Sequence, residues 1–121
     1  MIKKGENEKK VYVINDQFGC PTYSKDLVEC TLSMIDSNNF NKNKTYNFSN
    51  EGYTNWYELT KKIFELKKIK CEVVPVDSNQ YKNIAIRPKF SITDKSRIKD
   101  IFNISIRRWD EALEEFIINY K

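Results

Sequence analysis

The stretch Asn15-Asp16-Gln17-Phe18-Gly19-Cys20-Pro21-Thr22 lies between an apolar run and a helical pattern. Residues 11–14 before it are apolar apart from one tyrosine hydroxyl, which predicts a short strand buried on both faces. A glycine free to take positive φ and a proline that fixes φ predict a rigid turn after that strand. α/β proteins place ligand-contacting groups at such strand ends, although turns of this composition also serve as plain loops. The stretch therefore predicts an α/β fold with a candidate site at the turn.

Four helices are expected from the spacing of apolar residues and from their cap residues. Residues 24–36 form the first, with Ser24 as N-cap, and the pair Asn55 and Glu58 predicts a capping box for a second helix starting at residue 56. Asp94 is expected to cap a short helix that ends at residue 102, and Ser105 a final helix. The final helix carries an apolar stripe made of Trp109, Ala112, Leu113, Phe116, Ile117 and Tyr120.

Two further strands are expected, over residues 45–48 and 71–76. Three short strands make a thin sheet, so we interpret the strands at 11–14 and 45–48 as pieces of a larger parallel sheet. Residues 1–10 fit either the polar tail of a helix or a frayed arm. Trp56 and Trp109 both lie on apolar helical stripes, and we assign both to the core rather than to a stacking surface.

Composition limits the chain to one compact domain of 121 residues, with 40% hydrophobic residues to build a core. No apolar run is long enough for a transmembrane helix, and residues 1–10 lack the apolar core of a signal peptide. We therefore expect a cytoplasmic protein without a membrane partner. The net charge of +4 comes largely from lysines, which favour a solvated basic face over a nucleic-acid site, since no nucleic-acid motif accompanies them.

The chain has no histidine and three widely spaced cysteines, Cys20, Cys30 and Cys71. The absence of histidine excludes Ser-His and Cys-His nucleophilic schemes. A disulfide framework or a zinc site would need paired, closely spaced ligands. We therefore expect reduced thiols, with Cys30 and Cys71 packed, and no metal site.

The order of motifs resembles the C-terminal half of the dTDP-4-dehydrorhamnose reductase family, a branch of the extended short-chain dehydrogenase/reductases. The resemblance runs from about residue 11 to residue 121. It rests on the Asp-Gln-x-Gly-x-Pro-Thr turn, the helix start Asn55-Trp56-Tyr57-Glu58, and the block Arg87-Pro88-Lys89-Phe90-Ser91. It implies a mixed α/β fold, a single partial domain over residues 1–121 that lacks the N-terminal Rossmann part, and binding of a dTDP-sugar.

The resemblance also implies that the intact family protein uses NADPH. A dinucleotide site needs a Gly-x-Gly-x-x-Gly turn, and the glycines here are Gly5, Gly19 and Gly52, so we expect no cofactor on this chain alone. The family's catalytic set includes Tyr-x-x-x-Lys, which Tyr57 and Lys61 match. Because this pair lies in the substrate-domain helix, we interpret the match as coincidence and assign no catalytic residue.

Four residues are the candidate substrate contacts: Arg87, Asp16, Gln17 and Ser91. Arg87-Pro88 resembles an Arg-Pro step that contacts the nucleotide diphosphate, and a guanidinium can bind phosphate oxygens bidentately; the alternative is a surface salt bridge. Asp16 and Gln17 can contact the sugar or brace the loop, and we favour bracing. The family usually has Asn where this chain has Phe90.

Two functional hypotheses follow. The chain is either the substrate-binding part of an NADPH-dependent dTDP-4-dehydrorhamnose reductase, or a non-catalytic regulatory or assembly module that pairs with a separate cofactor-binding protein. In both cases we expect a missing Rossmann portion or a second copy of the chain as partner. We therefore predict an exposed apolar patch beside residues 15–22.

Overall fold

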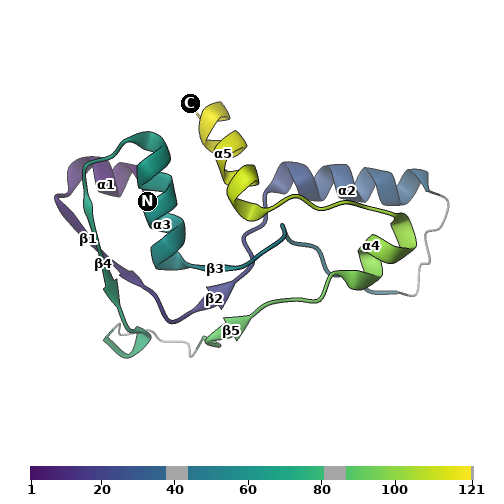
Figure 1. Cartoon of the computed structure of the whole chain (residues 1–121), viewed down its shortest axis with the longest axis horizontal. Coiled ribbons are helices and arrows are strands. Elements are labelled where there is room, and N and C mark those ends of the chain that lie inside the picture. The colour runs from purple at the N-terminus through teal and green to yellow at the C-terminus, as the bar shows by residue number, and fades with distance from the viewer. Residues whose placement is uncertain (38–43, 81–86, 121) are drawn as a thin grey trace.

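The computed structural model describes residues 1–37, 44–80 and 87–120 (Figure 1). Its elements confirm the mixed α/β class. They are, in chain order, α1 (Ile2–Asn7), β1 (Lys10–Ile14), β2 (Phe18–Gly19), α2 (Ser24–Asp36), β3 (Thr54–Asn55), α3 (Trp56–Lys67), β4 (Glu72–Val76), the 3-10 helix η1 (Ser78–Gln80), β5 (Phe90–Ser91), α4 (Ser96–Phe102) and α5 (Trp109–Asn119).

The described strands form two small sheets that the Asp-Gln turn connects. In the first, β1 pairs in parallel with β4, from Lys10 opposite Glu72 to Ile14 opposite Val76. In the second, β2 lies in the middle, antiparallel to β3 and parallel to β5. Figure 1 shows the first sheet at one end of the molecule with α1 and α3, and α2 and α4 at the other end, with the second sheet between them.

One hydrophobic cluster lies under the β1–β4 sheet. Its buried residues are Val11, Val13 and Phe64, with Cys71 and Val73 among the half-buried residues packed against them. Burial alternates along β1, because Tyr12 is 54% exposed between the two buried valines. The prediction that this strand is covered on both faces is therefore wrong, since the helices cover only one face of the sheet.

A second cluster, around Cys30, Ile98 and Phe102, joins α2 to α4. Residues 45–48 have no regular secondary structure and form no strand with the described residues, so the strand predicted there is wrong. Their aromatic side chains pack into the cluster instead. The rings of Tyr46 and Phe102 meet edge to face with centroids 5.1 Å apart.

The helix starts agree with the sequence at α3 and differ at the others. Asn55 Oδ1 accepts the amide of Glu58 at 2.8 Å, which confirms the N-cap but not the reciprocal contact of a capping box among the described residues. Ser24 is the first residue of α2 rather than its cap, because Tyr23 occupies the N-cap position. Asp94 accepts the Ser96 amide at 2.9 Å from just outside α4, whose N-cap is Lys95.

The final helix, α5, starts at Trp109 with Arg108 as its N-cap, so the predicted cap at Ser105 is wrong. Within its predicted stripe, Ala112 and Ile117 are buried, whereas Phe116 is exposed. Trp109 is half-buried. Among the described helices, none is long and apolar enough to cross a membrane.

Candidate functional site

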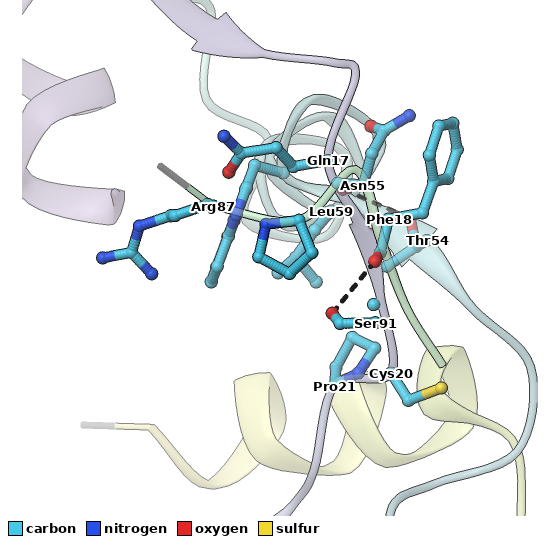
Figure 2. A pocket seen from close by; sticks show the side chains of 12 residues that line it. Gln17, Phe18, Cys20, Pro21, Thr54, Asn55, Leu59, Arg87 and Ser91 are labelled. Atoms are coloured by element: carbon cyan, nitrogen blue, oxygen red, sulfur yellow. Dashed lines mark hydrogen bonds between the residues drawn. The ribbon is translucent and has the colours of Figure 1, made fainter. Parts of the chain in front are cut away.

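A pocket of about 420 Å³ opens where the second sheet, made of β2, β3 and β5, meets the start of α3 (Figure 2). Three segments that are distant in sequence form its wall. They are residues 17–21 of the Asp-Gln turn and β2, residues 54–56 with Leu59, and the group Arg87, Pro88 and Ser91. The predicted turn therefore lies at a pocket, and the pairing of β2 with β3 and β5 brings the other two segments beside it.

Three of the four predicted substrate contacts line this pocket: Gln17, Arg87 and Ser91. The fourth, Asp16, does not line it. Its carboxylate accepts the amide of Ser78 at 3.0 Å and the hydroxyl of Ser78 at 2.7 Å. The Ser78 hydroxyl holds the pKa of Asp16 below its ordinary value. These contacts fit the bracing role for Asp16, because they tie the turn to the end of β4.

The polar side chains at the pocket differ in how many of their hydrogen bonds the protein itself supplies. Gln17 is only 8% exposed, yet its side-chain amide has no hydrogen-bond partner among the described residues. Ser91 donates its hydroxyl to the carbonyl of Phe18 at 3.1 Å, the dashed line in Figure 2. Arg87 is exposed and forms no ion pair with any residue that the structure describes. An amide and a guanidinium are thus available to a ligand at one pocket.

Trp56 is the main site residue that the sequence analysis missed. Its indole is 55% exposed and lines the pocket, so its assignment to the core is wrong. It shares a helix face with Thr60 and Phe64, which are buried, but it is the first residue of α3, beside the pocket. The sequence did contain a signal for this exposure, because Trp56 directly follows the Asn55 cap. A residue at the end of a helix can extend beyond the sheet that covers the rest of that helix face.

The Tyr-x-x-x-Lys match lies away from the pocket. The ring of Tyr57 packs against the cluster under the β1–β4 sheet. The ammonium of Lys61 lies 5.1 Å from the centre of that ring and 3.4 Å from the carboxylate of Glu58. Both side chains are thus occupied by structural contacts. Within the described ranges, no group of acidic or cysteine side chains is arranged to bind a metal ion.

The model of the RmlD substrate binding domain matches residues 1–121. The chain belongs to this family. The dTDP-4-dehydrorhamnose reductase of Streptomyces griseus is 31% identical over 95% of the chain and 39% of its own length. The spore coat polysaccharide biosynthesis protein SpsK of Bacillus subtilis is 32% identical over 97% of the chain and 40% of its own length.

Comparison with solved structures identifies the same kind of enzyme as the sequence relatives. The dTDP-4-dehydrorhamnose reductase of Bacillus anthracis, in complex with NADP, matches 99% of the chain and 41% of its own length with a TM-score of 0.87 at 33% identity. The ortholog from Clostridium acetobutylicum matches 97% of the chain and 41% of its own with a TM-score of 0.88 at 30% identity. The resemblance to the C-terminal half of this family is confirmed, and the chain spans about two fifths of the length of these relatives.

Proposed function

We propose that this chain is the substrate-binding portion of an NADPH-dependent reductase, and that the pocket in Figure 2 binds a dTDP-sugar. The observation that carries the proposal is the Gln17 amide, which is nearly buried, lacks a partner among the described residues, and lines the same pocket as the unpaired Arg87. The amide has no protein partner and lies at the pocket, so a ligand can hydrogen-bond it in place of water.

Each side chain at the pocket suits one part of a nucleotide sugar. The guanidinium of Arg87 can bind diphosphate oxygens through two parallel hydrogen bonds. The amide of Gln17 and the hydroxyl of Ser91 can contact sugar hydroxyls. The indole of Trp56 offers a flat apolar surface to the base or to a sugar ring.

The chain's own residues do not fit a dinucleotide. Gly5 is buried in α1, where its Cα faces the ring of Phe64, and Gly19 is paired in β2. Gly52 lies beside Trp109. These positions form no phosphate-binding turn at a helix N-terminus, and no step of hydride transfer is assigned to this chain. NADPH would be held by the portion of the longer relatives that this chain does not span.

In this proposal, residues 1–121 form a single partial domain. A second portion, which holds the cofactor, completes a cytoplasmic reductase. Helix α2 follows the turn of residues 15–22, which we call the site turn. It carries an exposed apolar row made of Val28, Leu32 and Ile35. Phe90 in β5 and Tyr53, directly before β3, are exposed as well. Apolar faces of this kind suit a covering partner. The alternative is a non-catalytic module that uses the same faces to pair with a separately encoded cofactor-binding protein or with a second copy.

Tryptophan fluorescence can test the site, because the chain has only two tryptophans and only Trp56 lines the pocket. In Trp109→Phe, the remaining emission comes from Trp56, and added dTDP or dTDP-glucose should change it with saturation. In the matched variant Trp56→Phe, the emission of Trp109 should stay constant. A saturable change of emission in Trp56→Phe but not in Trp109→Phe would refute the proposed site. The site would also be refuted if the emission of neither variant changes and calorimetry shows no heat of binding.

A further inference from the structure

We propose that Asn50 is a positioning residue, which fixes the part of the pocket wall formed by Cys20 and Pro21. Asn50 does not line the pocket itself and reaches it only through Pro21 and the backbone that follows Pro21. Its effect on ligand affinity rests on the proposed function, whereas its effect on the wall does not.

Asn50 contacts the wall on both sides of Thr22. Its backbone amide donates to the carbonyl of Pro21 at 3.2 Å. Its side-chain Oδ1 accepts the amide of Tyr23 at 2.8 Å. Asn50 is 0% exposed, so water does not compete for these groups. The end of the site turn is therefore held by a residue that lies 27 positions further along the chain.

The amide of Asn50 is oriented by its other contacts. Its Nδ2 donates to the carboxylate of Asp26 and, at 3.4 Å, to the carbonyl of Arg107. A flipped amide would direct its oxygen at that carboxylate, so only one orientation is favourable. In that orientation, Oδ1 faces Tyr23. Asp26 therefore acts on the wall through Asn50.

The backbone of Asn50 is fixed independently of its side chain. Its carbonyl accepts Nζ of Lys95 at 3.2 Å, and Lys95 is buried and also contacts Glu51 at 3.5 Å. Burial alone would raise the pKa of Glu51, but contacts with Lys99 and Lys95 lower it, so this carboxylate remains charged. The ion pair anchors the 49–51 segment to α4, and the segment in turn anchors the wall of the pocket.

Cysteine labelling can measure the position of the wall without any ligand. Cys20 lines the pocket, and Cys71 is a half-buried cysteine in the cluster under the other sheet. In Asn50→Ala, iodoacetamide should label Cys20 several-fold faster, with the rate at Cys71 unchanged in the same sample. Hydrogen exchange at the Tyr23 amide should also accelerate, because its acceptor is gone. The affinity for dTDP should fall about ten-fold, the scale of a lost hydrogen bond within a buried network.

Gly5→Ala is the matched control, since a Cβ there would clash with Phe64 and should lower stability at α1, away from the pocket. If Gly5→Ala changes Cys20 labelling and Tyr23 exchange as much as Asn50→Ala does, the positioning role is refuted. If Asn50→Ala does not fold, Asn50→Asp keeps the volume and Oδ1 but places a second carboxylate beside Asp26. Because repulsion from Asp26 replaces the Nδ2 hydrogen bond, this variant should also label faster at Cys20, and unchanged labelling in it would equally refute the role. Failure of the wild type to bind dTDP would overturn the proposed function, while the labelling and exchange results would still decide the role of Asn50.

Discussion

Arg107 contacts Asp26 through two hydrogen bonds, from Nε to Oδ2 at 2.9 Å and from Nη2 to Oδ1 at 2.6 Å. The remaining guanidinium edge donates to Glu115 of α5, which also pairs with Lys25 at 2.6 Å. These charges line a second hollow near α2, where they satisfy one another. The side chain of Asp26 is only 10% exposed, so water screens this pair less than a surface pair. The network joins the start of α2 to α5.

Acid should weaken the fold through Asp26. Burial alone would raise the pKa of this carboxyl, but the hydrogen bonds from Arg107 and Asn50 outweigh burial and lower it. A carboxyl whose pKa is lower in the folded state stabilises the fold above its unfolded pKa, and this contribution is lost as the pH falls through the folded pKa. Asp26→Asn should therefore lower the free energy of unfolding near pH 7 by about 1–3 kcal/mol.

Urea unfolding between about pH 7 and pH 2 checks this prediction. The loss of stability toward acid should be shallower in Asp26→Asn than in the wild type, because one of the responsible carboxyls is gone. Asp100→Asn, at an exposed position of α4, serves as control and should follow the wild-type curve. Parallel curves for the wild type and Asp26→Asn would show that Asp26 does not carry the acid response.

Gly5→Ala should destabilise the protein although alanine favours helices. A Cβ on Gly5 would clash with Cζ of Phe64 and lie 2.7 Å from Cε1 of the same buried ring. The clash should cost about 1–3 kcal/mol, more than the roughly 1 kcal/mol that alanine gains over glycine in a helix. Phe64→Leu should make room for the methyl group. The double variant should then be more stable than the sum of the two single changes predicts, and simple additivity would argue against the contact.

Local signals predicted the elements that depend on nearby residues. The Asn55 cap and the helix of residues 24–36 follow from cap and period signals within a few residues. The turn at Gly19 is wrong in its geometry, because Gly19 pairs in β2 without positive φ and the chain bends at Asp16. The strand predicted at residues 45–48 fails, because its alternating pattern matched a strand while its aromatic residues pack on Phe102. Asn50 carries no local signal, since its partners lie 24 to 57 positions away. The resemblance to the family supplied the candidate contacts, and the structure separated Asp16 from the other three.

Tyr57→Phe should leave the affinity for dTDP unchanged. The ring of Tyr57 packs under the first sheet, and the phenylalanine ring can keep that packing. The purified chain should also show no reduction of dTDP-4-dehydrorhamnose with NADPH, since its sequence contains no Gly-x-Gly-x-x-Gly turn. Calorimetry with dTDP measures the affinity, and the absorbance of NADPH measures the reduction. Turnover that disappears in Tyr57→Phe would instead identify Tyr57 as a catalytic residue.

Arg87→Ala should weaken the binding of dTDP-sugars while leaving the fold intact. A charge-assisted contact to a diphosphate contributes roughly 1.5–3 kcal/mol, or about ten- to a hundred-fold in Kd. Lys89→Ala is the matched control, because it removes a nearby positive charge whose side chain is 73% exposed and pairs with Asp16 at 3.7 Å outside the pocket. The control should change the affinity far less, and calorimetry on both variants makes the comparison.

The choice of ligand can assign the effect of Arg87 to the diphosphate. If the guanidinium contacts phosphate oxygens, Arg87→Ala should weaken dTDP strongly and thymidine hardly at all. Arg87→Lys should fall between the wild type and alanine, because lysine keeps the charge but lacks the planar pair of donors. Added salt should reduce the difference between Arg87→Ala and the wild type, since ions screen an exposed guanidinium. Equal losses for dTDP and thymidine would place the guanidinium against the nucleoside, and equal affinities in all variants would return Arg87 to an ordinary surface residue.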